Sequence, residues 1–391
     1  MNRAVKTLGY FAGLVGLAAA LSLFFSGLWG GKAEKGGMEL FEVSPGMTAR
    51  QFARGNGVPE AALAELLGAK GAAGLDEPLS SYKVDEGKFF AELFKRKALW
   101  DEEGSKNWRK IALKFALWFV FLGVVFALMR AGRITFGLRN VLYLSAVAVF
   151  GVLLGADPSP MGTVKDAIAL YGAKHLLFKP RFVALAVFLL LTVLANKFIC
   201  SWGCQLGALQ DFIFRLNGGP DRRPGLLRQF KPSFAFTNTV RALFFGVFTV
   251  VALGWGFDLI GPVDPFKFYN PSEVTLAGWG LIGAVLLGSL FVYRPWCHLF
   301  CPFGLVGWLA EKASVFKIKV NYDTCVACEA CAGACPSTVM GAILKRGRTV
   351  PDCFACGECI AVCPTRSISL AAGRRALPPP GKFSGLGLQK P

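Results

Sequence analysis

Eight of the twelve cysteines of this chain have the spacing of metal ligands. They form two runs near the C-terminal end, CVACEACAGACP from Cys325 to Pro336 and CFACGECIAVCP from Cys353 to Pro364. Each run has the pattern C-x2-C-x2-C-x3-C-P, with three closely spaced thiols, a fourth thiol and a proline. Thiolates at this spacing can surround one corner of a metal-sulfur cluster, and the small residues between them let backbone N–H groups approach the sulfurs.

This doubled pattern is typical of a ferredoxin with two 4Fe-4S clusters, in which the fourth cysteine of each run binds the cluster of the other run. One cluster is then expected on Cys325, Cys328, Cys331 and Cys363, and the other on Cys353, Cys356, Cys359 and Cys335. The alternatives are a disulfide framework or zinc sites. Zinc sites usually pair two C-x2-C knuckles, and neither alternative explains two complete triplets that each continue to C-P.

The other four cysteines form two C-x3-C pairs, each directly after a long apolar run. They stand in NKFICSWGCQLG and YRPWCHLFCPFG, at Cys200, Cys204, Cys297 and Cys301. Each pair has a basic residue three positions before its first cysteine and a glycine three positions after its second. These flanking residues are Lys197 and Gly207 in the first pair, and Arg294 and Gly304 in the second.

Three interpretations of these pairs are open. Cysteines at i and i+4 lie on one face of a helical turn, so two turns that face each other would bring four sulfurs together in a shared redox-active metal site, most readily a further iron-sulfur centre. The thiols could instead be buried packing residues. They could also form a dithiol-disulfide relay, although thiols at this spacing in a regular helix are hard to bridge. The repetition of the pair with its flanking residues favours the shared site.

The cysteine motifs lie in a strongly apolar chain. Of its 391 residues 54% are hydrophobic and 17% are charged, and the mean hydropathy is +0.48, which indicates a membrane protein. Six apolar runs approach or exceed the length that crosses roughly 30 Å of hydrocarbon as a helix. They are 8–29, 111–129, 140–156, 182–199, 239–257 and 274–293. Lys114 and Arg241 lie near the ends of two runs, and we expect their side chains to reach toward the lipid headgroups.

The basic residues place both termini on the cytoplasmic side. They concentrate at positions 3–6, 130–139 and 215–231 and in the C-terminal tail, as the positive-inside rule requires. The formal net charge of +18 follows this distribution, so it does not indicate nucleic-acid binding. The segment between the first two runs would then lie outside as a small docking module, with one helix capped by Thr48 and a second with Pro59 in its first turn.

The membrane region repeats one order of elements, namely helix, Asp-Pro loop, helix, C-x3-C pair and amphipathic helix. The expected fold is therefore a membrane all-α helical bundle of about six transmembrane helices with an internal duplication, followed by an α+β two-cluster bacterial ferredoxin-like domain. Five domains are expected: an N-terminal transmembrane anchor (1–29), an extracytoplasmic helical segment (30–107), a transmembrane core (108–319), the ferredoxin domain (320–372) and a flexible tail (373–391). The anchor is expected to be retained, because its apolar run is too long for a signal peptide.

Residues 140–372 resemble the membrane-bound polyferredoxins, typified by the NapH-type quinol dehydrogenase subunit of periplasmic nitrate reductase systems and the C-terminal half of NosR-type nitrous oxide reductase activators. The resemblance rests on the two C-x3-C pairs, the second of which continues to Pro302, and on the two ferredoxin runs. It implies a bacterial inner-membrane protein that passes electrons between menaquinol or ubiquinol and a periplasmic or cytoplasmic redox partner. Gln205 stands where the family pattern has proline, and the N-terminal helix and outside segment are extra to the short NapH-type layout.

Other cofactors find little support in the residues present. The chain has two histidines, His175 near an outside loop and His298 inside the second pair, so a bis-histidine haem is not expected. The sequence contains no G-x-G-x-x-G fingerprint after a strand and no NosR-type flavin attachment sequence, so neither NAD nor a covalent flavin is expected. No residue is assigned a catalytic role, and His298 is expected to pack or hydrogen-bond locally rather than accept a quinol proton.

Three functions remain as alternatives to electron transfer. The chain could be a maturation or regulatory factor for a periplasmic metalloenzyme, or a copper-handling membrane protein that uses the C-x3-C pairs. It could also be an anchor whose clusters only stabilise the fold. Quinol-dependent redox changes and metal content distinguish these functions from one another.

Overall fold

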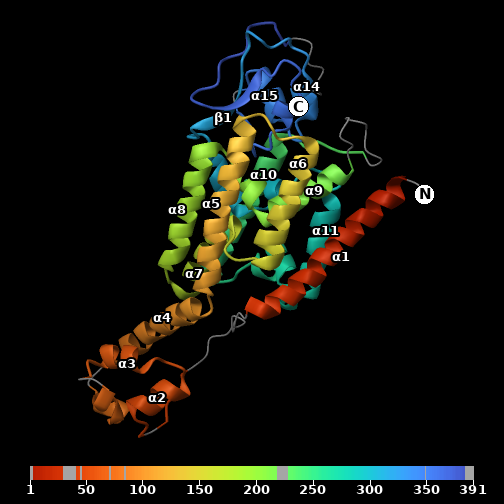
Figure 1. Ribbon diagram of the computed structural model, residues 1–391. Coiled ribbons are helices and arrows are strands. Elements are labelled where there is room, and N and C mark those ends of the chain that lie inside the picture. Colours follow the sequence, from red (N-terminus) through yellow and green to blue (C-terminus); the bar gives the residue numbers. More distant parts are fainter. Residues whose placement is uncertain are drawn as a thin grey trace. The chain divides into compact units, whose positions relative to one another are not determined.

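Two compact units make up the computed structural model (Figure 1). The large unit comprises Met1–Gly30, Trp108–Ala173 and Lys179–Pro391, and the small unit comprises Gly31–Asn107 and Lys174–Phe178. The structure describes residues 3–29, 41–44, 46–69, 72–82, 85–217, 228–347 and 349–383. Residues 30–40 of the expected outside segment and 384–391 of the expected flexible tail therefore lie outside the described residues.

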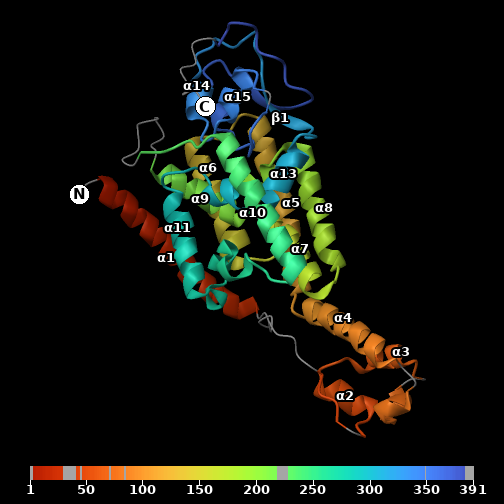
Figure 2. The same cartoon turned by 180° about the vertical axis from the view of Figure 1, so that it is seen from behind.

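Helices build most of the large unit (Figure 2). They are α1 (Arg3–Trp29), α5 (Trp108–Arg130), α6 (Phe136–Ala146), α7 (Pro160–Lys174), α8 (Lys179–Ala195), α9 (Gln205–Leu216), α10 (Phe234–Trp255), α11 (Leu276–Gly288), α12 (Pro295–Leu299) and α13 (Pro302–Glu311). A π-helical segment at Val147–Leu153 continues α6, and another at Ile199–Gly203 precedes α9. α13 packs beside α8, where the rings of Phe188 and Phe303 meet edge to face at 6.4 Å.

Within the described residues, four helical stretches are long and apolar enough to cross a membrane. They are Val5–Gly27, Trp108–Arg130, Phe136–Leu153 and Phe234–Trp255, and they agree with four of the six expected spans. The other two runs form shorter helices, since α8 has 17 residues and α11 has 13. The backbone leaves α8 before Asn196, which has a left-handed φ of 57°. α11 ends at Gly288 although the apolar run continues.

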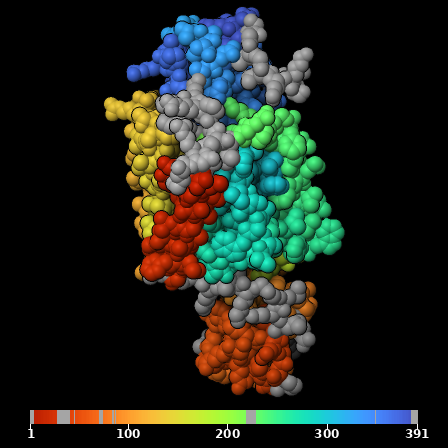
Figure 3. All heavy atoms as spheres, turned by 90° about the vertical axis from the view of Figure 1, so that its right-hand side faces the viewer, coloured from red at the N-terminus to blue at the C-terminus, as the bar shows by residue number. Residues whose placement is uncertain are grey.

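α1 lies on the surface of the large unit (Figure 3). Only 11% of its apolar span is buried, as for a helix that faces lipid. It contacts the π-helical segment that continues α6, α9, and the 3-10 turns at Pro265–Tyr269 and Pro271–Glu273. The apolar run near the N-terminus is therefore a helix of full membrane length.

Lys114 and Arg241 point into the protein, so the expectation that they reach the headgroups was wrong. Their exposed fractions are 0% and 1%. Lys114 Nζ donates to the carbonyl oxygen of Gly155 at 2.8 Å, and Arg241 Nη1 donates to the Asp352 carboxylate at 2.6 Å. A cation can be buried where such partners replace its hydration shell, and these partners lie far away in the sequence.

The contacts at the two ends of helix α5 define the two opposite ends of the helical bundle in the large unit. Arg130, in the last turn, lies over the ring of Phe316 with 5.5 Å between the guanidinium carbon and the ring centroid. Phe316 begins the strand that leads into the cysteine runs, so this is the ferredoxin end. Lys114 lies near the start of α5 and contacts the loop at Gly155. That loop marks the opposite end.

The ferredoxin end contains a two-stranded antiparallel sheet and three short helices, as an α+β domain requires. β1 (Phe316–Val320) pairs with β2 (Ile368–Ala372), with Phe316 opposite Ala372. The helices are α14 (Ala330–Ala334), α15 (Val339–Leu344) and α16 (Glu358–Ala361). Part of the expected flexible tail packs on this domain, because Lys382 Nζ donates to the Tyr322 carbonyl at 2.7 Å and the Phe383 ring lies 6.1 Å from the Tyr322 ring.

The small unit has its own apolar core. Its helices are α2 (Ala49–Gly55), α3 (Glu60–Leu67) and α4 (Glu86–Gly104). The expected cap of α2 is confirmed, since the Thr48 hydroxyl accepts from the Gln51 N–H at 3.2 Å and the Gln51 side chain accepts from the Thr48 N–H. Phe52, Leu63 and Leu93 are fully buried between these helices.

Candidate iron-sulfur sites

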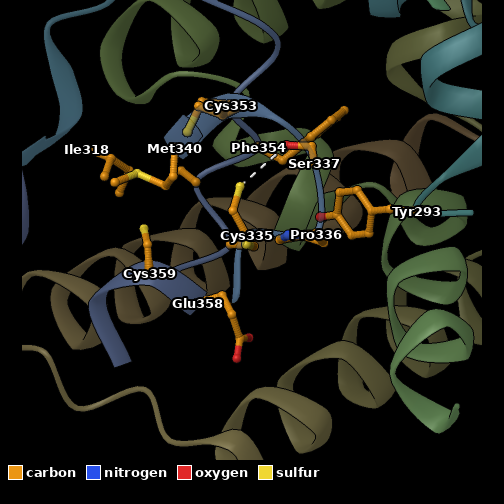
Figure 4. A pocket seen from close by; sticks show the side chains of 14 residues that line it. Tyr293, Ile318, Cys335, Pro336, Ser337, Met340, Cys353, Phe354, Glu358 and Cys359 are labelled. Atoms are coloured by element: carbon orange, nitrogen blue, oxygen red, sulfur yellow. Dashed lines mark hydrogen bonds between the residues drawn. The ribbon is translucent and has the colours of Figure 1, made fainter. Parts of the chain in front are cut away.

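Eight cysteines at the ferredoxin end line two cavities. Cavity A is lined by Cys335, Cys353, Cys356 and Cys359, and cavity B by Cys325, Cys328, Cys331 and Cys363. The structure thus brings the first three cysteines of each run together with the fourth cysteine of the other run. Figure 4 shows Cys335 from the first run beside Cys353 and Cys359 from the second at cavity A.

The cavities suit a metal-sulfur cluster in their donors, because each is lined by four cysteine sulfurs. Backbone N–H groups approach the sulfurs, with Ala355 donating to Cys353 and Ser367 donating to Cys363 at 3.2 Å. Among the described residues, no three Cys, His, Asp or Glu side chains are close enough together to hold a single metal ion.

Burial affects the protonation of these thiols. It raises the pKa of Cys331 to about 11 and holds the pKa of Cys356 above its ordinary value. Iron binds thiolates, so cluster assembly at these cavities must release protons, and the metal charge offsets the cost of burying the thiolates.

The two cavities have different surroundings. At cavity A the indole Nε1 of Trp202 donates to the Ala355 carbonyl at 3.1 Å, and the Phe354 ring packs 5.2 Å from the His298 ring. At cavity B the Cys328 side chain is exposed. Cavity A therefore lies against the helices of the large unit, while cavity B lies nearer the solvent.

A buried ion-pair group connects cavity A to α10 and to the first C-x3-C pair. Asp352 directly precedes Cys353 and accepts from Lys197 Nζ at 3.0 Å and from Arg241 Nη1 at 2.6 Å. Although burial opposes ionisation, these two cations hold the pKa of Asp352 below its ordinary value. The Glu311 carboxylate accepts from the Cys353 N–H at 3.1 Å, and burial followed by the nearby Asp352 raises the pKa of Glu311 to about 8.

A second ion-pair group connects cavity A to α6 and α9. Glu358 directly precedes Cys359 and accepts from both Arg139 and Arg215. Sequence reasoning missed both Glu358 and Asp352. The signal was present, since acidic residues precede the first and third cysteines of the second run, while Thr324 and Ala330 stand there in the first run.

The two C-x3-C pairs share one backbone geometry. Their four cysteines are all buried, with exposed fractions of 7% to 9%. The first cysteine of each pair lies in a short helical turn, and the second lies in extended backbone directly before α9 or α13. Cys204 has φ −75° and ψ 113°, and Cys301 has φ −67° and ψ 118°. The regular helical turn expected for each pair is therefore absent, because the chain turns sharply at its second cysteine.

The structure brings the two pairs together. Gln210 of α9, the helix that follows the first pair, lies against the second pair. Its Nε2 is 3.8 Å from the Cys297 sulfur, and its Oε1 accepts from the Trp296 N–H at 3.1 Å. We call the four buried thiols of the two pairs the cysteine quartet.

Each pair is held by the basic residue that precedes the other pair. Arg294 Nη1 donates to the Cys200 carbonyl at 2.7 Å, and Lys197 Nζ donates to the Gly304 carbonyl at 2.5 Å. Arg294 also forms a 2.6 Å ion pair with Asp211 of α9. The basic residues noted in the sequence therefore act across the two pairs rather than within one.

The flanking glycines allow close helix packing. A Cβ atom on Gly207 would lie 2.4 Å from the Cys200 carbonyl oxygen, and one on Gly304 would lie 2.7 Å from the Cys297 carbonyl oxygen. Both distances are too short for any side chain. Each glycine thus lets a helix begin directly against the first cysteine of its pair.

His298 packs locally, as expected. Its Nδ1 lies 3.2 Å from the Arg294 carbonyl oxygen, and its ring contacts the rings of Phe354 and Tyr293. The side chain thus lies between the second pair and cavity A.

Two protein-family models match the segments that contain these sites. A 4Fe-4S dicluster domain matches residues 317–368, which include all eight cysteines of the two cavities. A 4Fe-4S binding domain matches residues 180–225 and 275–321, and each of these segments contains one C-x3-C pair.

Several curated proteins are similar to parts of the chain. YccM of Escherichia coli (strain K12), whose name describes electron transport, is 28% identical over 178 residues, which are 42% of this chain and 48% of YccM. The ferredoxin-type protein NapH of Haemophilus influenzae is 25% identical over 202 residues, which are 50% of this chain and 63% of NapH. The uncharacterized protein MJ0750 of Methanocaldococcus jannaschii is 23% identical over 158 residues, 40% of this chain and 65% of that protein. The matches thus span less than two thirds of each relative, and no solved structure matches the chain.

Proposed function

We propose that this chain, which is similar to NapH over half of its length, passes electrons between membrane quinone and a partner redox protein through iron-sulfur clusters. One observation carries the proposal, namely that each cavity is lined by three cysteines of one run and the fourth of the other. This is the arrangement in which crossed ligands hold two 4Fe-4S clusters.

The ligand assignment follows the two cavities. Cavity A would hold its cluster on Cys353, Cys356, Cys359 and Cys335, and cavity B on Cys325, Cys328, Cys331 and Cys363. Such clusters supply one-electron transfer without making or breaking bonds. The chain's own contribution is to position the sulfurs, exclude water around cavity A and set the potential through N–H···S bonds and nearby charges.

The surroundings of the cavities support an order of transfer. Cavity A contacts the helices of the large unit through Trp202 and Phe354, while cavity B has an exposed ligand at Cys328. Electrons exchanged with quinone in the membrane would therefore pass through cavity A. Electrons exchanged with a water-soluble partner would pass through cavity B.

The orientation we propose places the ferredoxin end and both termini in the cytoplasm of a bacterium, with the helices in its inner membrane. Arg130, Arg139 and Arg215 support it, since all three contact the domain at the ferredoxin end. Basic residues at one end of a membrane protein are typical of its cytoplasmic side. The segment 30–107 would then be periplasmic, because it follows α1, a helix long enough to cross the membrane.

We also propose that the large unit arose by internal duplication. One family model matches both segments with a C-x3-C pair, and Cys204 and Cys301 have nearly the same backbone angles. A repeat of two crossings would place both pairs at the same end of the bundle, close enough to interact.

Crossed ligation has a direct test. Replacing Cys335→Ser should alter the cluster held mainly by the second run, because Cys335 lines cavity A. The matched variant Cys363→Ser should alter the other cluster, because Cys363 lines cavity B. The measurement is electron paramagnetic resonance of the reduced full-length protein. Serine variants of the first three cysteines in each run identify the signal of each cluster. If each serine changed the cluster of its own run, the crossed assignment would be wrong.

Electron exchange with quinone has a separate test. The purified protein in detergent should have its clusters reduced by a menaquinol or ubiquinol analogue, or oxidised by the matching quinone, as followed by visible absorbance. Chemical reduction by dithionite serves as the control that the clusters are intact. Clusters that respond to dithionite but to neither form of the quinone would indicate that they only stabilise the fold.

A further inference from the structure

We infer that the cysteine quartet, Cys200, Cys204, Cys297 and Cys301, holds a third iron-sulfur centre inside the large unit, next to cavity A. The inference rests on the proposed electron-transfer function and extends the electron route beyond the ferredoxin domain. Its first support is that two segments about a hundred residues apart bring four buried thiols together, as Arg294 Nη1 donates to the Cys200 carbonyl at 2.7 Å and Gln210 Nε2 of α9 lies 3.8 Å from the Cys297 sulfur. Cysteines that serve only as packing residues have no need to meet as a set of four.

Backbone donors aimed at the sulfurs provide the second support. The N–H groups of Leu206 and Gly207 donate toward the Cys204 sulfur, and the Gly304 N–H donates toward the Cys301 sulfur. These donors belong to the first turns of α9 and α13, whose N–H groups have no partner inside the helix. The positive ends of two helices thus meet at the quartet, and both effects stabilise thiolates over thiols.

The third support is the charge around the first pair. Arg294 Nη1 donates to the Cys200 carbonyl at 2.7 Å, and Lys197, three residues before Cys200, is fully buried. Arg294 pairs with Asp211, and Lys197 shares Asp352 with Arg241. An anionic iron-thiolate centre would face these buried cations where water cannot reach them.

A short contact path connects the quartet to cavity A. Trp202 lies between the two cysteines of the first pair and donates to Ala355, which lies between Cys353 and Cys356. The Phe354 ring is covered by Arg294 at 4.7 Å and Lys197 at 5.4 Å. One electron can therefore leave the centre at the quartet as the centre at cavity A gains it, or the reverse, and no proton or bond changes.

Other contacts connect the quartet to the opposite end of the large unit. Gln205 Nε2 donates to the Ala156 carbonyl at 2.8 Å, and Trp296 Nε1 lies 3.2 Å from Met161 Sδ. Ala156 and Met161 belong to the segment that Lys114 contacts near the start of α5. The quartet thus lies between the ferredoxin end and the opposite end, so a centre there would carry electrons into the interior of the membrane unit.

The test is iron and acid-labile sulfide analysis of the full-length protein, purified without oxygen. The two ferredoxin clusters account for about eight irons per chain. We expect more than this in the wild type, and a fall to about eight in the double variant Cys204→Ser and Cys301→Ser, with the ferredoxin signals in electron paramagnetic resonance unchanged. The control Cys328→Ser should disturb a ferredoxin signal and keep the additional spectrum, which Mössbauer spectroscopy of iron-57 protein would show.

The outcomes separate the two hypotheses. A wild type with about eight irons, and with the quartet recovered as free thiols or a disulfide by mass spectrometry, would overturn the third centre and leave the proposed function intact. Copper or zinc at the quartet would overturn it as well. Missing ferredoxin signals in the wild type would instead contradict the proposed function. The wild-type analysis decides the question even if the double variant does not fold.

Discussion

Gly207 and Gly304 set how closely α9 and α13 approach the first cysteine of each pair. At Gly207 the atom that blocks a side chain is a backbone oxygen, 2.4 Å from the place of a Cβ atom, so no rotamer change can relieve the clash. We expect Gly207→Ala to displace α9 and to lower the free energy of unfolding by about 1–3 kcal/mol. The midpoint of thermal unfolding in detergent measures this loss.

The matched control is Gly246→Ala on the exposed face of α10, where a Cβ atom would meet nothing within 4 Å. Alanine is the better helix former by roughly 0.5–1 kcal/mol, so this variant should be as stable as the wild type or slightly more so. Equal midpoints for the two alanine variants would mean that α9 can move away without cost.

Single residues show what sequence alone could predict. The spacing of the cysteine runs predicted which thiols would share a cavity, because that pattern is local and repeated. The direction of the Lys114 and Arg241 side chains was mispredicted, since their partners Gly155 and Asp352 are 41 and 111 positions away along the chain. The flanking glycines were visible, but the carbonyl contacts that require glycine appear only in the folded chain.

At the scale of elements, ion pairs fasten α16 of the ferredoxin domain to α6 and α9. Glu358→Gln should destabilise the protein, because it leaves the buried Arg139 without its carboxylate, while Arg215 keeps Asp211 at 2.6 Å. Loss of one partner of a buried pair typically costs about 3–5 kcal/mol. Thermal unfolding and limited proteolysis of the ferredoxin domain should both detect the loosened contact.

The exposed carboxylate of Asp323 provides the control, and Asp323→Asn should leave the midpoint unchanged. A second substitution, Arg139→Gln, should recover part of the loss in Glu358→Gln because it removes the unpaired charge. A Glu358→Gln protein as stable as Asp323→Asn would show that this ion pair contributes little.

Helix lengths were harder to predict than helix positions. The apolar run at 274–293 suggested a full span, yet α11 has 13 residues. Apolar residues continue past its end because the following turn is buried in the protein, as Leu290 and Tyr293 are, and Tyr293 packs against Phe214 of α9. Hydropathy reports burial, and it does not distinguish burial in lipid from burial in protein.

At the scale of the whole molecule, the positive-inside rule relates the net charge of +18 to membrane topology, because an excess of basic residues is typical of cytoplasmic segments. We therefore expect the ferredoxin end to be cytoplasmic and residue 107 to be outside. Alkaline phosphatase, which is active only outside the cytoplasm, should then be active when fused after Asn107 and inactive when fused after Pro391. Green fluorescent protein at the same two positions should give the reverse pattern. Phosphatase activity at Pro391 would invert the orientation and place both cavities on the periplasmic side.

The reciprocal contacts of the two C-x3-C pairs also have a consequence for biosynthesis. Arg294 leaves the ribosome 94 residues after Cys200, the residue whose carbonyl it binds. At about 5–20 residues per second this delay is roughly 5–20 s, during which the Cys200 carbonyl lacks the Arg294 donor. Cys297 and Cys301 follow Arg294 in the chain, so a centre held by all four cysteines could be assembled only after that interval. The first pair must therefore stay reduced and accessible until the second half has been made.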